Sequence, residues 1–214
     1  MSLDGFIAGP NRTVEQPLGD GGDQLHEWMF GLASFRERHG LSGGTRNADD
    51  DVVRESLDTA GAVLMGRRMF SGGEGPWEDD PVADGWWGDD PPFGVPVFVL
   101  THHARETVKK QGGTSFTFVT EGIEAALDQA REAAGDKDVA VAGGANLVQQ
   151  HLKAGLLDEM QIHLAPDLLG DGVRLFDQLG DAQLELEVTR ALHSPSVTHV
   201  RYSVVKRRGG GTRS

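Results

Sequence analysis

The sequence has no cysteine, which excludes disulfide bonds and metal sites built on thiolates. No run approaches the ~18 consecutive apolar residues that a membrane-spanning helix needs. Basic residues are also scarce, with 20 Lys and Arg against 33 Asp and Glu and a formal charge of −13. Such an acidic chain is unsuited to binding nucleic acid or an anionic membrane. A local cluster of basic side chains is therefore informative wherever it occurs.

Several targeting and nucleotide-binding signals are missing too. Residues 1–5 lack the charged start and apolar core of a secretory signal, and we expect a cytoplasmic protein. The same stretch resembles the end of a strand, so either that strand is short or the natural chain begins upstream. No Gly-x-Gly-x-x-Gly opens a helix after the first strand, and no Gly-x-x-x-x-Gly-Lys-Ser/Thr loop occurs. An ordinary Rossmann or P-loop nucleotide site is therefore unsupported.

The periodicity of apolar residues predicts strands alternating with helices. Short apolar runs typical of buried strands occupy residues 62–65, 96–100, 116–119 and 139–142. Apolar residues at helical spacing occupy residues 24–39, 49–60, 123–134 and 147–152.

The last third of the chain has a different pattern. Apolar and polar residues alternate over 160–164, 184–188 and 200–204, which predicts half-exposed antiparallel strands. The fold class predicted is α/β, with a mixed, mostly parallel sheet flanked by helices and an antiparallel C-terminal part. We expect one domain over residues 1–206 and a flexible, basic, glycine-rich tail over 207–214.

Three predicted strands end in residues suited to phosphate. Met65 precedes Gly66-Arg67-Arg68, Leu100 precedes Thr101-His102-His103, and Ala142 precedes Gly143-Gly144. In open α/β sheets, ligands lie outside the carboxyl ends of the strands. Guanidinium groups match phosphate oxygens, and paired glycines before a helix bring backbone N–H groups close to an anion. Together these segments predict a site for an extended phosphate-bearing ligand.

Each of these segments also has a simpler interpretation. The arginines are compatible with an ordinary surface position, the histidine pair with a solvated loop, and the glycine pair with a tight turn. However, the segments after the second and third strands carry Arg67, Arg68, His102, His103 and Arg105, and no acid until Glu74 and Glu106. An NAD-selective site commonly places an acid against the ribose hydroxyls. The basic cluster therefore predicts NADPH rather than NADH.

Five stretches occur in the order typical of one family: residues 2–9, 65–70, 99–102, 142–146 and 168–176. With them the chain resembles the dihydrofolate-reductase-like superfamily, and within it the reductase domain of riboflavin-biosynthesis deaminase-reductases. The resemblance covers nearly the whole chain except the tryptophan-containing loop over 71–93 and the tail. It implies a single-domain reductase that uses NADPH.

The resemblance also implies roles for individual residues. The cofactor would be held by residues after the three strands, namely Gly66, Arg67, Arg68, Met69, Leu100, Thr101, His102, Gly143, Gly144, Ala145, Asn146 and Leu147. Met69 departs from the threonine usual in dihydrofolate reductases and lacks its hydroxyl. The folate-binding carboxylate of those enzymes has no clear counterpart, so a pyrimidine- or pterin-like substrate fits better than folate. No metal is expected.

On the substrate side we expect four residues. Asp4 is the candidate catalytic group, relaying a proton or binding an amino group of the ring, although an Asp-Gly turn explains it equally well. Phe70, Trp77 and Trp86 are candidate substrate contacts, because aromatic side chains stack on flat rings. The alternative for the tryptophans is a loop packed on the surface or on a partner subunit.

The function expected is hydride transfer from NADPH to a small heteroaromatic or imine-containing substrate. A non-catalytic module that binds a nucleotide or another ligand on the same fold is the alternative from another class. The alternating C-terminal strands leave a sheet edge that needs cover, so we expect a homodimer.

Overall fold

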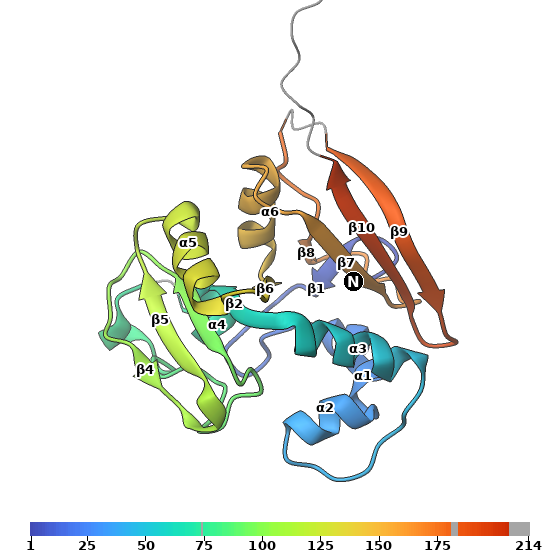
Figure 1. Ribbon diagram of the computed structural model, residues 1–214, viewed down its shortest axis with the longest axis horizontal. Helices are drawn as coiled ribbons and strands as arrows, with labels where there is room; N and C mark the ends of the chain where they lie inside the picture. The colour runs from blue at the N-terminus through green and yellow to red at the C-terminus, as the bar shows by residue number, and fades with distance from the viewer. Residues whose placement is uncertain (74, 181–183, 206–214) are drawn as a thin grey trace, which may run out of the picture.

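The computed structural model describes residues 1–73, 75–180 and 184–205 (Figure 1). Its largest sheet has five strands, in which β5, β3, β2 and β6 are parallel and β4 is antiparallel. In spatial order they are β4 (Val108–Lys109), β5 (Ser115–Val119), β3 (Pro96–Leu100), β2 (Ala60–Gly66) and β6 (Asp138–Gly143). The prediction of three neighbouring parallel strands with their carboxyl ends on one rim is confirmed.

Two apolar layers cover this sheet. On one face, α5 (Ile123–Ala134) and α6 (Ala145–Lys153) pack against Ala62 and Leu64. On the other face, Phe70 of the short helix α4 (Arg67–Ser71) packs against Val63 and Met65. Successive residues of a strand point to opposite faces, so a central strand covered on both sides is apolar throughout. This is why 62–65 is an unbroken apolar run.

The strand β6 differs from that prediction. Its residues are only half-buried, and Ala142 is exposed, although the sequence predicted a strand buried on both faces. The reason is its place at the edge of the sheet, where β2 is its one neighbour among the strands that the structure describes. Edge strands leave backbone groups and side chains accessible, and here they open onto the cleft described below.

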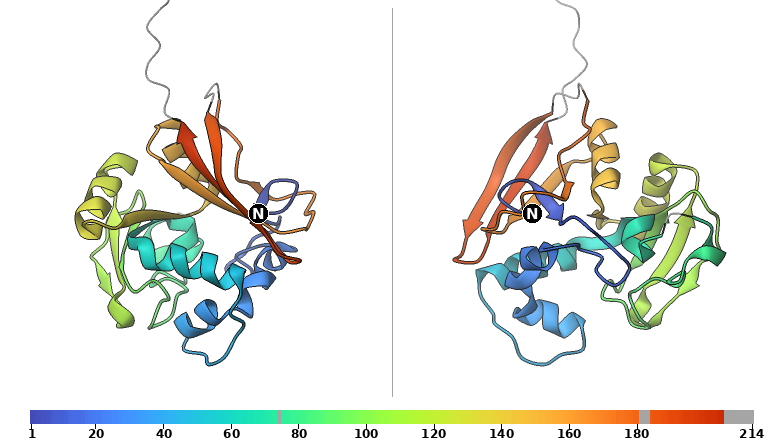
Figure 2. Two further views of the ribbon diagram at one scale, coloured as in Figure 1. Left: turned by 45° about the vertical axis from the view of Figure 1, so that its right-hand side comes forward. Right: turned by 180° about the vertical axis from the view of Figure 1, so that it is seen from behind.

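The C-terminal strands form a separate sheet rather than an extension of the first (Figure 2). It contains β7 (Glu159–Leu164), β10 (Thr198–Val205) and β9 (Glu185–His193), antiparallel in that order. A two-stranded ladder joins β1 (Phe6–Ala8) to β8 (Val173–Arg174). The antiparallel part is as predicted, but the single continuous sheet is not, because β6 and β7 are not paired. The outer strand β9 is exposed along most of its length.

The helix predicted over residues 24–39 is broken into three pieces: η1 (Gly22–His26), α1 (Glu27–Phe30) and α2 (Ala33–Arg38). The break falls at Gly31 and Leu32, where Leu32 is extended. The backbone of Thr45 donates to Gly31 and accepts from Ala33, replacing helical hydrogen bonds there. A distant segment thus decides where this helix ends.

The helix α3 (Ala48–Thr59) begins as predicted and continues directly into β2. The side chain of Asn47 caps it by accepting a hydrogen bond from the Asp50 N–H at 3.0 Å. Asp50 is buried and accepts from the Ser34 N–H at 2.7 Å, which joins α3 to α2. The residue after the predicted helix, Gly61, lies within β2.

The long loop after α4 is ordered around its aromatic residues. It contains η2 (Trp77–Asp79), and a further short helix, η3 (Gln111–Gly113), precedes β5. The Trp77 indole donates to the backbone oxygen of His103 at 2.8 Å, and Trp77 and Trp87 pack on the phenylalanine-rich face of the sheet. The loop is therefore part of the packed domain.

The predicted tail, residues 207–214, lies outside the described residues. Within the described ranges, none of the helices has the length and apolar character needed to cross a membrane. The same ranges contain no cluster of His, Cys, Asp and Glu suited to a metal ion.

Candidate functional site

The ends of β2, β3 and β6 meet at one rim of the five-stranded sheet. Gly66 is the ladder partner of Leu100, and Met65 is the partner of Gly143. The segments that follow line one broad cleft of about 2110 Å³, together with residues from β1, β7 and α6. A drug-sized ligand fills roughly 300–1,000 Å³, so this cleft has room for an extended ligand beside a small molecule.

The paired glycines form the turn from β6 into α6. Gly143 has a φ of 125°, which favours glycine, and the peptide bond to Gly144 is cis. A Cβ added at Gly144 would meet nothing within 4 Å, whereas one at Gly143 would lie 3.5 Å from the Met69 sulfur. Gly143, Gly144, Ala145, Asn146 and Leu147 all line the cleft. The first N–H groups of a helix have no intrahelical acceptor, so this wall presents backbone donors to the cleft.

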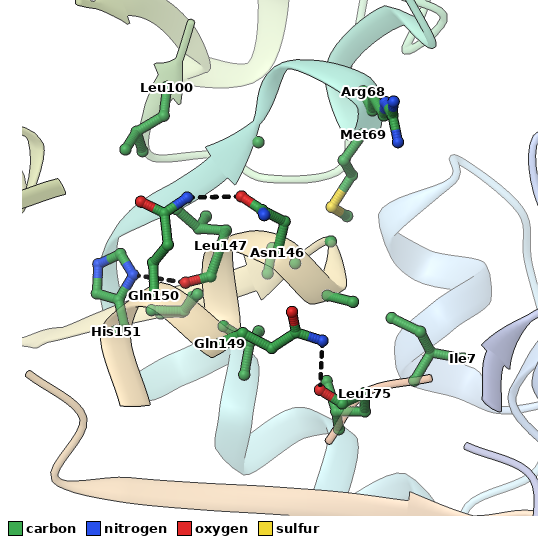
Figure 3. Close-up of a pocket in the computed structure, with 18 of the residues that line it drawn as sticks. Ile7, Arg68, Met69, Leu100, Asn146, Leu147, Gln149, Gln150, His151 and Leu175 are labelled. Carbon is green, nitrogen blue, oxygen red and sulfur yellow. Dashed lines mark hydrogen bonds between the residues drawn. The ribbon is translucent and has the colours of Figure 1, made fainter. Parts of the chain in front are cut away.

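Side chains of α6 stabilise that wall (Figure 3). Gln150 donates to the Asn146 side-chain oxygen at 2.5 Å, and Gln149 donates to the backbone oxygen of Leu175 at 3.0 Å. Met69 points from α4 toward α6, and Arg68 stands beside it (Figure 3). Gln149 is 5% exposed and was missed by sequence reasoning. A polar residue at a buried helical position, one turn before Leu152, is the signal that would have indicated it.

Arg67 is buried, which excludes the surface position that the sequence left open. Its side chain is 7% exposed, and its Nη2 lies 2.5 Å from Asp80 Oδ2. The guanidinium stacks on Trp77 at 3.6 Å from the ring centroid. Its Nε and Nη1 are buried and have no hydrogen-bond partner among the described residues. Arg67 is also one of the residues that line the cleft, and a guanidinium with unpartnered N–H groups is suited to an anion.

Asp80 corrects the expectation of an acid-free basic cluster. It comes from the loop after α4 and accepts hydrogen bonds from Ser71 and from the Val82 N–H as well as from Arg67. Burial by itself raises the pKa of Asp80, but these three hydrogen bonds lower it below its ordinary value. A second acid, Asp84, pairs with Arg105 at 2.5 Å. Long-range folding therefore brings an acid to Arg67 and another to Arg105.

The remaining basic residues differ in their surroundings. Arg68 and His102 are exposed and line the cleft, as does Leu100. Thr101 is 8% exposed, and its hydroxyl accepts a hydrogen bond from the His103 N–H at 3.1 Å. That hydroxyl therefore stabilises its own turn at the rim.

The structure places Asp4 outside the cleft lining. Its carboxylate accepts hydrogen bonds from the N–H groups of Leu169 at 3.2 Å and Gly170 at 2.7 Å. Hydrogen bonding from Ser2 and from these backbone groups lowers the pKa of Asp4 to about 2. These contacts match the turn interpretation, in which Asp4 holds the loop before β8. A catalytic role for Asp4 has no support from this placement.

The three aromatic residues predicted to contact substrate are separated by the fold. Phe70 is fully buried and stacks edge-on against Phe116 and Phe118, at 5.0 and 5.2 Å between ring centroids. Trp77 packs on Arg67 and does not line the cleft, whereas Trp86 does. The expectation of direct substrate contact is therefore corrected for Phe70 and Trp77, because both support the rim from beneath. For Trp86 it stays a prediction.

A polar cluster in the antiparallel part was missed entirely. His163 of β7 and His199 of β10 are ladder partners, with their Nδ1 atoms 2.6 Å apart. The His199 Nε2 lies 3.0 Å from Asp49 Oδ1 of α3, and Trp28 packs on both imidazoles at 5.1 Å. His163 lines the cleft. The only sequence signal was a histidine at a polar position of each strand, and strand pairing cannot be deduced from that alone.

Burial controls the protonation of this cluster. Desolvation, followed by the charges of His199, the N-terminus and His26, lowers the pKa of His163 to about 4. Burial also lowers the pKa of His26. His163 is therefore neutral at pH 7.

A model of the RibD C-terminal domain family matches residues 1–200. The chain belongs to the RibD C-terminal domain family. The resemblance to the reductase domain of riboflavin-biosynthesis deaminase-reductases is thereby confirmed, and so is the α/β fold class with a mostly parallel sheet. The cleft therefore lies within a RibD C-terminal domain.

Solved structures and a curated relative agree with this family. The chain is similar to a putative riboflavin biosynthesis protein from Shewanella sp. PV-4, at 25% identity and a TM-score of 0.61 over 96% of both chains. It shares its fold with a deaminase and 5-amino-6-(5-phosphoribosylamino)uracil reductase from Thermotoga maritima, at 16% identity and a TM-score of 0.53 over 95% of this chain and 54% of that one.

The curated relative is the uncharacterized protein YwjB of Bacillus subtilis (strain 168), which is 35% identical over 75 residues. That match spans 35% of this chain and 42% of YwjB, so it covers less than half of the relative's length. It therefore carries no activity to this chain.

Proposed function

We propose that this RibD C-terminal domain protein is an NADPH-dependent reductase. It would transfer hydride to a small pyrimidine- or pterin-like ring or to an imine, as a family that includes a uracil-derivative reductase suggests. The observation that carries the proposal is Arg67, which lines the same cleft as the paired glycines and whose buried Nε and Nη1 lack hydrogen-bond partners among the described residues. An anionic cofactor at this rim would supply those partners.

The residues present fit such a cofactor. The wall formed by Gly143, Gly144 and the start of α6 would hold the pyrophosphate through backbone N–H groups. Arg67 and Arg68 would hold phosphate oxygens, and exposed His102 lies on the same rim. When bound, the dinucleotide supplies the hydride. The work of the chain is to bind and orient it, and to hold the acceptor in a site that excludes water.

The choice of NADPH rests on the arginines. One charge-assisted hydrogen bond to phosphate is worth about 1.5–3 kcal/mol, which corresponds to roughly 10- to 150-fold in affinity. Arg67 shares its guanidinium with Asp80, whereas Arg68 is exposed at the cleft. We therefore expect Arg68→Ala to weaken NADPH binding by that factor and to change NADH binding little.

The test is the dissociation constant of each dinucleotide at low and moderate salt. Arg46→Ala is the matched control, because Arg46 is exposed, pairs with Glu37 and does not line the cleft. It should leave both constants unchanged. Equal affinity of the unmutated protein for NADH and NADPH would refute the assignment of the basic rim to a 2′-phosphate.

The competing proposal is a binding module without turnover. It would show the same dinucleotide affinity. The two are separated by following NADPH oxidation with a panel of pterin, pyrimidine and imine compounds. Oxidation with any member supports the reductase, and tight binding without oxidation across the panel favours the module.

A further inference from the structure

The hydrogen bonds of the Asp49–His199–His163 cluster specify where its protons lie. The Asp49 carboxylate accepts only, so His199 Nε2 must carry a proton to bond with it at 3.0 Å. With His199 neutral, its Nδ1 is then an acceptor, and the 2.6 Å contact requires a proton on His163 Nδ1. His163 Nε2 is left as a bare lone pair. When both rings are neutral, the chain of bonds thus imposes one tautomer on each imidazole.

One added proton reverses this order. A proton taken up by His163 Nε2 allows His163 Nδ1 to pass its own proton to His199 Nδ1. His199 then becomes the imidazolium and bonds to Asp49, while His163 stays neutral with its proton on Nε2. The positive charge therefore appears beside the carboxylate, at His199, which is 3% exposed. The group that exchanges the proton, His163, is neutral before the uptake and again after its Nδ1 proton has moved to His199.

The end of this chain lies at the cleft. His163 lines it together with Ile7, Trp28 and Leu175. Its Nε2 makes no hydrogen bond to another described residue, and it is absent from the buried atoms that lack a partner. We infer that Asp49, His199 and His163 form a proton relay whose outer atom, His163 Nε2, exchanges a proton with the substrate. Asp49 and His199 act through His163 and are positioning residues.

The direction of transfer rests on the proposed reductase function. Reduction of a C=N bond needs a hydride on carbon, which reduced nicotinamide dinucleotide supplies, and a proton on nitrogen. In the charged relay, His163 Nε2–H gives its proton to that nitrogen, and His199 Nδ1–H passes its proton to His163 Nδ1. The C=N double bond becomes a C–N single bond with new C–H and N–H bonds. His199 returns to neutral, and solvent recharges the relay.

Few other charges act on His163. The N-terminal ammonium donates to the backbone oxygen of His163 at 2.7 Å, and His26 lies on the neighbouring η1. Both disfavour positive charge on His163. On the side of α3, Asp49 is the acid bonded to the relay, while Glu55, about two turns on, is paired with Arg190 and Arg201. The N-terminus and His26 therefore disfavour charge at His163, whereas His199 is bonded to Asp49 and borders a small cavity that Arg190 and Arg201 also line.

The relay can be tested without any ligand. The full chain, labelled with ¹⁵N-histidine, is titrated from pH 8 to pH 4 while long-range ¹H–¹⁵N NMR spectra report which ring nitrogen carries a proton. At pH 8 we expect His163 to be protonated at Nδ1 and His199 at Nε2. On acidification, His199 should become doubly protonated as the His163 proton moves from Nδ1 to Nε2, with one shared midpoint.

The variants assign and perturb these signals. His163→Gln and His199→Gln identify the resonances. Asp49→Asn removes the carboxylate charge and should move the shared midpoint to lower pH by at least one unit, a tenfold change in proton affinity. His26→Gln is the matched control, because His26 also lines the cleft but lies outside the relay. It should leave the transition coupled.

The NMR result stands whether or not the variants fold, because the unmutated protein decides it. A single shared transition with the proton exchange described supports the relay. Independent titration of the two rings, or a proton on His163 Nε2 while His199 is neutral, overturns it.

An activity measurement separates this inference from the proposed function. With an acceptor that supports NADPH oxidation, His163→Gln should slow single-turnover hydride transfer by about 10²- to 10⁴-fold. It should leave the NADPH dissociation constant unchanged and flatten the pH profile, whereas the unmutated rate should rise as pH falls through the shared midpoint. An unaltered profile in the variant would overturn the catalytic use of the relay. If none of the acceptors tried supports NADPH oxidation by the unmutated protein, the reductase proposal fails. The NMR titration still decides the relay in that case.

Discussion

Replacing Arg67 by alanine should destabilise the fold strongly, because it leaves Asp80 without its ion-pair partner. The two side chains are 7% and 3% exposed, so neither charge is solvated well. Breaking a buried ion pair by removing one member costs about 3–5 kcal/mol. For a chain of this size that loss lowers Tm by roughly 6–20 °C, at about 2–4 °C per kcal/mol. The stacking of Arg67 on Trp77 is lost as well.

The assay is urea unfolding of four proteins: unmutated, Arg67→Ala, Asp80→Ala and the double variant. Because each single change leaves the other charge buried, the double variant should be more stable than the sum of the single changes predicts, by about 1.5–3 kcal/mol. Arg68→Ala is the control, because Arg68 is the next residue and is exposed. This change should alter the free energy of unfolding by no more than about 0.5 kcal/mol.

Two results would refute this reasoning. One is a loss below about 1 kcal/mol for Arg67→Ala, which would mean that Arg67 and Asp80 are not a buried pair. The other is additivity of the two single changes, which would mean that each acts separately on the loop after α4. Either outcome would also remove the buried donors on which the anion site depends.

Three further outcomes follow from particular positions. Gly144→Val should fold normally, because its Cβ meets nothing within 4 Å, yet weaken dinucleotide binding at least about tenfold by filling the cleft wall, as titration would measure. Asp4 has a pKa of about 2, below the ~3.9 of an unfolded chain, so the stabilisation that its carboxylate contributes is present above pH 4 and lost toward pH 2. In acid unfolding, Asp4→Asn should therefore lose less free energy of unfolding between pH 4 and pH 2 than the unmutated protein does. We propose a homodimer through the exposed β9 edge, where Val188 is 58% exposed, and expect Val188→Lys to give monomers in sedimentation; an unchanged oligomeric state would place the interface elsewhere.

Local patterns were sufficient for the parallel core. A strand covered on both faces must be apolar at every position. The apolar run over 62–65 therefore predicted β2, and the apolar run over 96–100 predicted β3. The turn from β6 into α6 was equally predictable, because paired glycines directly before an apolar helical pattern indicate a turn into a helix. These features depend on residues adjacent in the sequence.

Local patterns did not predict the length of the helix over 24–39 or the division of the strands into separate sheets. The apolar spacing over 24–39 is that of one helix, yet backbone hydrogen bonds from Thr45 break it at Gly31. The strands of both parts were recognised, but nothing local states that β6 and β7 remain unpaired. Both decisions are made by contacts with distant segments.

In the candidate site, too, some features depend on neighbouring residues and others on distant contacts. By itself the sequence determined which strand ends carry donors for an anion, because strand, glycine turn and helix start follow from neighbouring residues. Only the tertiary structure decided which side chains are committed elsewhere: Arg67 pairs with Asp80 13 residues away, and Asp49 bonds to His199 across 150 residues. Burial and hydrogen-bond partners set the charge and tautomer of such groups, and they exist only once the chain is folded.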